Sequence, residues 1–123
     1  PWDVPKVYWA ATAKSALTEG LADMTDLPDG WIRVGADDLG FGYPDDAIDA
    51  VIEAPEALPA KIAAMRAHAT QITVADDGAT FALSNKIALP VSAVEHYILA
   101  AGTPGERDAR GWETDLLAGL DLQ

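Results

Sequence analysis

Cysteine is absent from this sequence of 123 residues, and basic residues are few. Without thiols the chain cannot form a disulfide scaffold, a thiolate zinc site or a cysteine nucleophile. Eight Lys and Arg residues against twenty Asp and Glu give a formal net charge of −12 at pH 7. Nucleic acids and anionic membrane surfaces attract clustered Lys and Arg, so we predict that neither is a partner.

Long hydrophobic runs are also missing. No stretch of the sequence reaches the roughly 18 consecutive apolar residues that would span a bilayer. Residues 1–5 have neither the basic region nor the apolar region of a signal peptide, and they do not start with Met. We therefore predict a cytoplasmic protein, and we expect a further segment to precede Pro1.

The composition is that of a folded domain. Half of the residues are hydrophobic and 23% are charged, which is typical of globular chains and not of disordered ones. The length is close to that of a common single domain, in which a substantial core can be buried. We find no internal repeat or linker that would divide the chain.

Several segments have the pattern of β-strands. Residues 4–12 are rich in β-branched and aromatic side chains, and residues 47–53 alternate apolar with polar ones, as in a strand with one wet face. Residues 95–101 read as another strand. The segment 72–83 contains Asp77-Gly78 between two β-like runs, which is a strong hairpin signal.

Two segments predict helices. Residues 14–24 have apolar residues at helical spacing, with Ser15 as a candidate N-cap, and a second helix begins near Leu58 because Pro59 suits only a first turn. The Gly- and Asp-rich segment 37–46 cannot hold a regular helix. Together these elements predict an α+β fold: a small, mostly antiparallel or mixed sheet with two or three helices. The apolar positions of the two helices are Leu17, Leu21 and Met24, then Leu58, Ile62, Met65 and Ala69.

Neither histidine belongs to a metal-binding spacing. His68 and His96 lie on separate predicted elements, so we interpret both as structural. His96 follows Glu95 directly, but neighbours on a strand point to opposite faces, which argues against a working pair.

The acidic residues between positions 37 and 49 do not have the register of a calcium-binding loop, and we interpret the segment as a solvated loop. The sequence also contains no nucleophile elbow and no complete phosphate-binding loop. The four tryptophans are more typical of core or interface anchors than of ligand platforms. By themselves, the residues therefore predict a folded acidic domain without a complete catalytic constellation. The tryptophans are Trp2, Trp9, Trp31 and Trp112.

Several longer phrases carry a family resemblance. They occupy residues 2–9, 41–50, 61–71, 83–85, 95–97 and 110–120, and together they span nearly the whole chain. In this order and spacing they closely resemble the C-terminal part of the mycothiol-pathway deacetylases of actinobacteria. Those enzymes form part of the LmbE-like (GlcNAc-PI de-N-acetylase) superfamily.

The resemblance implies a zinc-dependent hydrolase that removes acetate from a glucosamine–inositol pseudodisaccharide. In the family, zinc activates a water and an aspartate acts as general base, but both zinc motifs lie in a Rossmann-like N-terminal portion absent from this sequence. Tyr43 stands where the ligating His of a His-Pro-Asp-Asp motif would be. Residues 1–123 are therefore expected to be the C-terminal domain of a larger α/β enzyme, with that enzyme's own N-terminal catalytic domain as partner. The full-length parent would hold zinc, whereas this chain alone would contain no catalytic or metal-ligating residue, bind no zinc and be inactive.

By the same resemblance, two residues of the Gly-rich loop are expected to bind the small-molecule sugar–inositol substrate. Asp38 would accept a hydrogen bond from a sugar hydroxyl, and Phe41 would supply an apolar wall; a purely structural loop is the alternative. A stand-alone, non-catalytic binding module and part of a related mycothiol-conjugate amidase also remain open as functions of the chain.

Overall fold

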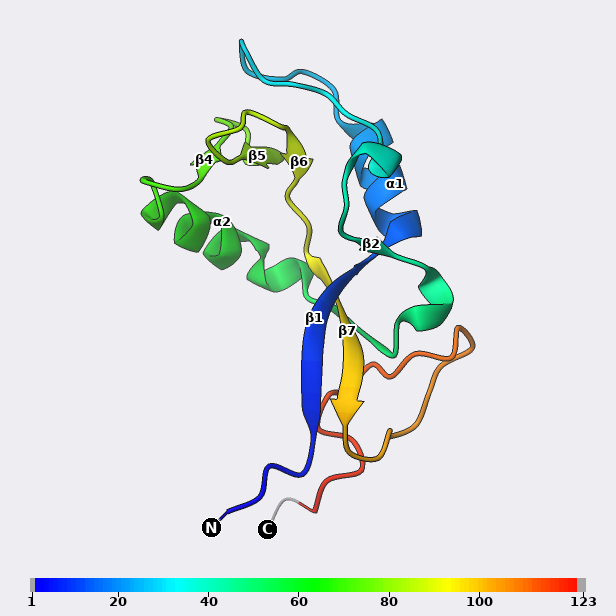
Figure 1. Cartoon of the computed structure of the whole chain (residues 1–123). Helices are drawn as coiled ribbons and strands as arrows, with labels where there is room; N and C mark the ends of the chain where they lie inside the picture. Colours follow the sequence, from blue (N-terminus) through cyan, green and yellow to red (C-terminus); the bar gives the residue numbers. More distant parts are fainter. Residues whose placement is uncertain (1, 122–123) are drawn as a thin grey trace.

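The computed structural model describes residues 2–121, which form two α-helices and two β-sheets (Figure 1). The four-stranded sheet has the order β2-β1-β7-β3, and the three-stranded sheet has the order β4-β5-β6. The predicted α+β class is confirmed, with the strands divided between two sheets. The bounds are β1 Val7–Ala13, α1 Lys14–Asp23, β2 Gly42–Tyr43, β3 Ala50–Glu53, α2 Leu58–Ala67, β4 Thr73–Val74, β5 Thr80–Ala82, β6 Leu89–Pro90 and β7 Val94–Ala101.

The larger sheet is built around the antiparallel pair of β1 and β7, the two longest strands. Strand β3 pairs antiparallel with the other side of β7, whereas β2 runs parallel to β1 and touches it at only two positions. One face of this sheet carries a core in which Val51 and Ile48 pack with Ala13 and Trp112. Because Trp112 comes from the C-terminal tail, this core joins the two ends of the chain.

A second core lies against α1. Leu17, Leu21 and Met24 are buried together with Ala88, which confirms the predicted apolar stripe of this helix. The predicted cap at Ser15 is wrong: Ala13 occupies the N-cap position, and no side chain of that residue can cap the helix.

The N-terminus of α1 is instead held by a residue far along the chain. The Asp45 carboxylate accepts hydrogen bonds from the Ser15 amide, at 3.3 Å, and from the Ser15 hydroxyl, at 2.6 Å. A carboxylate at this position satisfies unpaired amide groups and complements the helix dipole. This contact fixes the short 3-10 helix Asp45–Ala47 beside α1.

The second sheet and α2 form a small lobe (Figure 1). The predicted hairpin is confirmed: β4 pairs with β5, and Gly78 in the turn has φ +75°, a conformation that favours glycine. The helix begins at Leu58, as predicted, but ends at Ala67, before Ala69 of the predicted stripe. None of its side chains is fully buried; Ile62 and Met65 are half-buried, so α2 only partly covers the lobe.

Other elements differ from the expectation in their bounds. The strand expected over residues 47–53 is shortened to β3, because residues 45–47 form a 3-10 turn. Strand β6 lies in residues 86–93, a segment for which no element is predicted from the sequence. Of the tryptophans, Trp112 is buried and Trp31 is half-buried against the α1 core, whereas Trp2 and Trp9 are exposed. No helix within residues 2–121 is long and apolar enough to cross a membrane.

Candidate functional site

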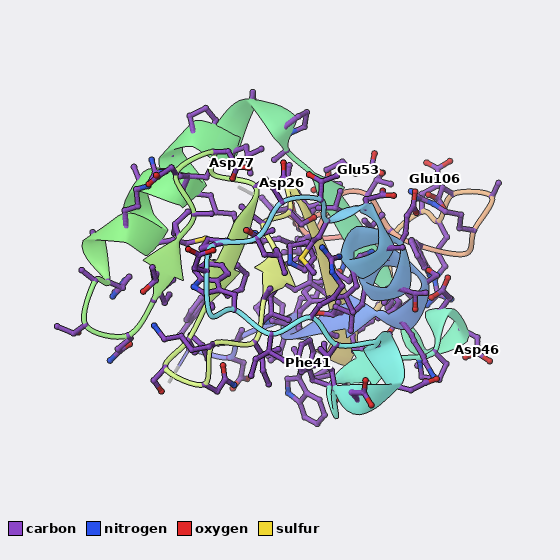
Figure 2. All side chains as sticks on the ribbon, turned by 90° about the horizontal axis from the view of Figure 1, so that it is seen from above. Asp26, Phe41, Asp46, Glu53, Asp77 and Glu106 are labelled. Carbon is purple, nitrogen blue, oxygen red and sulfur yellow. The ribbon has the colours of Figure 1, made fainter. Side chains whose placement is uncertain are left out.

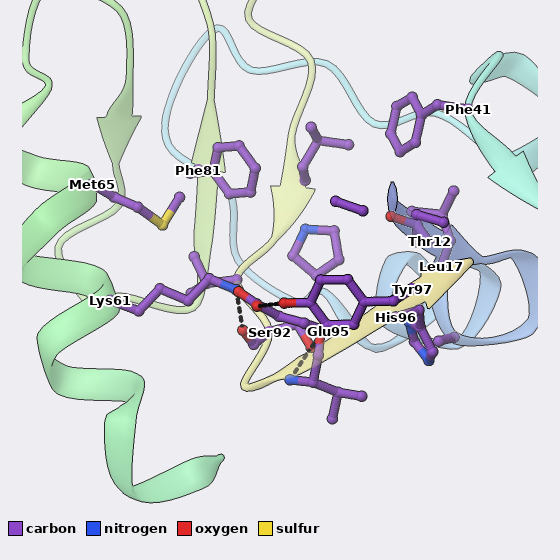
Figure 3. A pocket seen from close by; sticks show the side chains of 17 residues that line it. Thr12, Leu17, Phe41, Lys61, Met65, Phe81, Ser92, Glu95, His96 and Tyr97 are labelled. Carbon is purple, nitrogen blue, oxygen red and sulfur yellow. Dashed lines mark hydrogen bonds and ion pairs between the residues drawn. The ribbon is translucent and has the colours of Figure 1, made fainter. Parts of the chain in front are cut away.

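A cavity of about 360 Å³ lies between the two sheets. Residues of β1 and β7 line one side of the cavity, and residues of α2, β5 and β6 line the other (Figure 3). Most of its wall is apolar, with Met65, Phe81 and Phe41 among the large side chains that line it. A cavity of this size with a few polar groups is the usual form of a small-molecule site.

The polar residues of the cavity wall include Thr12, Ser92 and His96. Three others, Lys61, Glu95 and Tyr97, are joined by hydrogen bonds and are here called the cavity cluster. The Tyr97 hydroxyl donates to Glu95 Oε2 at 2.7 Å, and Lys61 Nζ donates to Glu95 Oε1 at 3.3 Å. Lys61 Nζ also donates to the carbonyl of Ser92 at 2.7 Å. Figure 3 shows these side chains meeting from α2 and β7 at one end of the cavity.

Their contacts set the charge of the cluster. The hydrogen bond from Tyr97 and the nearby Lys61 ammonium hold the pKa of Glu95 below its usual value, although partial burial opposes this shift. The same hydrogen bond, together with burial, raises the pKa of Tyr97 to about 12. At neutral pH the cluster is therefore an anionic carboxylate held between a cation and a neutral hydroxyl donor.

The structure places the two predicted substrate-binding residues differently. Phe41 is 45% exposed and lines the cavity, opposite β7. Asp38 does not line the cavity; its Oδ2 accepts a hydrogen bond from the Gly35 amide at 3.0 Å, and the residue remains exposed. The loop thus brings Phe41, but not Asp38, to the cavity wall.

His96 packs inside the protein, whereas His68 lies on its surface. His96 is buried, and its ring packs edge-on against Trp112 with the centroids 5.5 Å apart. Burial lowers the pKa of His96, which favours the neutral ring. Glu95 accepts a hydrogen bond from Tyr97, two residues along β7. The Glu95 side chain therefore lies on the opposite face of the strand from that of His96, as predicted. His68 is exposed and follows the last residue of α2.

The acidic residues of the loops do not converge on one point. Figure 2 shows Asp26, Asp46, Glu53, Asp77 and Glu106 spread over separate parts of the molecule. Within residues 2–121, no three His, Asp or Glu side chains lie close enough together to hold a metal ion. The zinc that the resemblance implies therefore does not fit the residues of this part of the chain.

Several of these acids have local structural partners. Asp45, in the segment that imitates a metal motif, caps α1, and Asp49 accepts a hydrogen bond from the Leu99 amide. The Asp37 carboxylate lies 2.7 Å from Lys14 Nζ, and this cation lowers the pKa of Asp37.

A second polar cluster was not predicted from the sequence. Glu113 is fully buried, and its carboxylate accepts hydrogen bonds from Lys6 Nζ at 2.7 Å, from the Tyr8 hydroxyl at 2.7 Å and from the Gly105 amide at 2.8 Å. Lys6 Nζ donates a further bond to the Ala118 carbonyl at 3.0 Å. Lys6, Tyr8 and Glu113, here called the buried cluster, join residues more than 100 positions apart in the chain.

Burial and pairing act in opposite directions on this cluster. Burial alone would raise the pKa of Glu113, but the bonds from Lys6, Gly105 and Tyr8 leave it below its usual value. Burial would likewise lower the pKa of Lys6, but Glu113 and Tyr8 leave it raised. Both groups are therefore charged at neutral pH, and they form a buried ion pair.

Comparison with known proteins gives the family context. No family model matches the chain. Over 122 residues, or 99% of the chain, it is 64% identical to a protein of Mycolicibacterium smegmatis, of which it covers 42%. It is 61% identical to a protein of Mycolicibacterium gilvum and 55% identical to one of Mycobacterium tuberculosis, covering 43% and 41% of them. Each of these proteins is named 1D-myo-inositol 2-acetamido-2-deoxy-alpha-D-glucopyranoside deacetylase.

The fold and the comparisons thus define an acidic α+β segment that is similar to part of proteins named as deacetylases. The chain spans about two fifths of the length of the curated relatives that it matches. It is homologous to the C-terminal part of the mycothiol-pathway deacetylases, which confirms the predicted resemblance.

Proposed function

We propose that this chain is the C-terminal domain of a zinc-dependent deacetylase and that it acts by completing the substrate pocket of a Rossmann-like catalytic domain. The observation that carries the proposal is the match of nearly the whole chain, at 55% to 64% identity, to part of proteins named as a deacetylase of a sugar–inositol compound. The substrate class follows from that name: an acetylated amino sugar linked to inositol. The reaction would take place in the cytoplasm.

The proposed reaction is hydrolysis of an acetamide. The oxygen of water bonds to the acetamide carbonyl carbon, the bond between that carbon and nitrogen breaks, and the nitrogen leaves as an amine after gaining a proton. Zinc would supply an activated water, and residues of the catalytic domain would hold it.

The contribution of the present chain is binding. Phe41 is exposed at the cavity wall and can cover the apolar face of a sugar ring. The Asp38 carboxylate has one hydrogen bond, to the Gly35 amide, and so retains capacity to accept another from a sugar hydroxyl. Both residues are exposed on one loop, with Phe41 at the cavity wall and Asp38 outside the cavity, so the two would contact different parts of one ligand.

Acetate release tests the proposal. The longer protein containing this chain should release acetate from the N-acetylated glucosamine–inositol pseudodisaccharide, and a chelator should abolish the activity. The 123-residue chain, assayed alone with added zinc, should release none. Acetate release by the isolated chain, or no release by the longer protein, would contradict the proposal. Preferential hydrolysis of mycothiol conjugates by the longer protein would instead identify an amidase.

A further inference from the structure

Strand β1 is paired over most of its length on one side and only at its C-terminal end on the other. Strand β7 pairs with it from Val7 to Ala11, whereas β2 pairs with it at Thr12 and Ala13 alone. Over residues 8–11, the described part of the chain therefore offers no second partner strand. In Figure 1 the lower half of β1 has β7 on one side and no ribbon on the other.

The hydrogen bonds of β7 define which of its backbone groups point toward β1. The Tyr97 carbonyl accepts a bond from the Asp49 amide at 2.9 Å, and the Leu99 amide donates to Asp49 Oδ2 at 2.7 Å. Both groups therefore point toward β3. Because the direction alternates along a strand, the backbone groups of His96 and Ile98 point toward β1.

This alternation identifies the free groups of β1. Trp9 lies opposite Ile98 and Ala11 opposite His96, so the amides and carbonyls of Trp9 and Ala11 point inward. The backbone groups of Tyr8 and Ala10 consequently point outward. Thr12, the next residue in the same series, pairs with β2, in agreement with this assignment. Tyr8 and Ala10 thus present an unpaired strand edge.

The side chains along this edge do not protect it. Trp9 is 65% exposed, and Trp2, in the segment that leads into β1, is 84% exposed. Natural edge strands are usually blunted by charge, often a lysine, but Lys6 is turned inward to Glu113. A register shift between Val7 and Tyr8 interrupts the edge only at its start. A bare edge beside exposed tryptophans is typical of a surface covered in the assembled protein.

We infer that the outward edge of β1, at Tyr8 and Ala10, pairs with a strand of the catalytic domain and so extends a sheet across the domain boundary. The inference rests on the proposed function, in which a catalytic domain precedes this chain. More than half of each relative lies outside the match, which corresponds to their C-terminal part. The N-terminal segment leads directly into β1, so this strand lies next to the junction. A second copy of this chain is a poorer occupant, because each copy carries a net charge of −12.

Amide hydrogen exchange of individual residues tests the inference. In the isolated chain, the amides of Tyr8 and Ala10 should exchange quickly, whereas those of Trp9 and Ala11 should be protected. In the longer protein, Tyr8 and Ala10 should become protected by about 100-fold, because their amides are then hydrogen-bonded within the structure. Unchanged fast exchange at both residues in the longer protein would overturn the inference, even where acetate release supports the proposed function.

A matched pair of variants separates pairing from general stability. Trp9→Lys should lower the thermal midpoint of the longer protein and leave that of the isolated chain nearly unchanged. Leu83→Lys, which also replaces an exposed apolar residue but lies away from β1, should change neither. An equal decrease caused by both variants in the longer protein would contradict the assignment. A third outcome would also contradict the assignment: in the isolated chain, protection of the Tyr8 and Ala10 amides from hydrogen exchange that rises with protein concentration. That result would identify a second copy of the chain as the partner of the β1 edge.

Discussion

The buried cluster and the cavity cluster use the same three kinds of side chain in different surroundings. Each contains a Lys, a Glu and a Tyr, and in each the Glu accepts hydrogen bonds from the other two. In the buried cluster the Lys and Glu side chains are 3% and 0% exposed. In the cavity cluster the corresponding values are 35% and 53%.

The comparison separates a structural role from a binding role. Two buried charges are stable only while paired, so the buried cluster fixes the C-terminal tail to the start of β1. The cavity cluster borders solvent, where an ion pair contributes little to stability, and its groups can exchange partners with a ligand. The burial of each cluster, rather than its residue types, therefore decides whether it stabilises the fold or can bind a ligand.

The largest expected effect is on the buried cluster. Glu113→Gln should reduce the free energy of unfolding by about 3–5 kcal/mol, because it leaves the Lys6 ammonium buried without its counter-charge. The matched variant Glu95→Gln should cost about 1 kcal/mol or less. Urea unfolding of both variants at pH 7 measures the difference, and equal losses would remove the distinction between the clusters.

A steric change near the buried cluster should have the next largest effect. A Cβ at Gly105 would lie 2.5 Å from Ala118 Cβ, whereas a Cβ at Gly40 would meet nothing within 4 Å. Gly105→Ala should therefore destabilise the chain by about 1–3 kcal/mol through overpacking, and Gly40→Ala should be nearly neutral. Thermal unfolding of the two variants tests this; similar midpoints would mean that the tail adjusts freely around Gly105.

The stability of the chain in acid should depend on Glu113 of the buried cluster. The pKa of Glu113 is below its ordinary 4.5 in the folded chain, so its stabilising contribution is present above that pH and lost as the pH falls through the folded pKa. One such group contributes a slope of at most about 1.4 kcal/mol per pH unit. Below pH 4.5, stability should fall less steeply in Glu113→Gln than in the unsubstituted chain. Parallel curves would show that Glu113 does not contribute to acid unfolding.

The smallest expected effect concerns salt. The coupling energy between Lys61 and Glu95, measured with a double-mutant cycle, should be below about 1 kcal/mol and should decrease in 1 M NaCl. The coupling between Lys6 and Glu113 should persist, because solvent ions do not reach it. A salt-resistant Lys61–Glu95 coupling would indicate that the cavity is closed to solvent.

Local patterns in the sequence were sufficient for most elements of the fold. The spacing of Leu17, Leu21 and Met24 predicted α1, and Asp77-Gly78 predicted the hairpin, because both signals depend on near neighbours. The cap of α1 was missed since Asp45 lies 30 residues from Ser15. The apolar stripe predicted for α2 is only half-buried, because periodicity indicates an apolar face without indicating what covers it.

The site was less predictable than the fold. The resemblance pointed to Phe41, which lines the cavity, but single-sequence patterns gave no signal for Lys61, Glu95 and Tyr97 as a group. Their contact depends on how α2 docks against β7, which is a long-range property. The same holds for Lys6 and Glu113, whose pairing no local spacing predicts.

The kinetics of Phe41→Ala in the longer protein test the central claim, that this domain forms part of the substrate pocket. We expect KM for acetate release to rise about ten-fold with kcat little changed, since one apolar contact to the bound sugar is lost. Phe81→Ala, on the far wall of the same cavity, serves as the comparison and should change KM less. An unchanged KM for Phe41→Ala would contradict the claim.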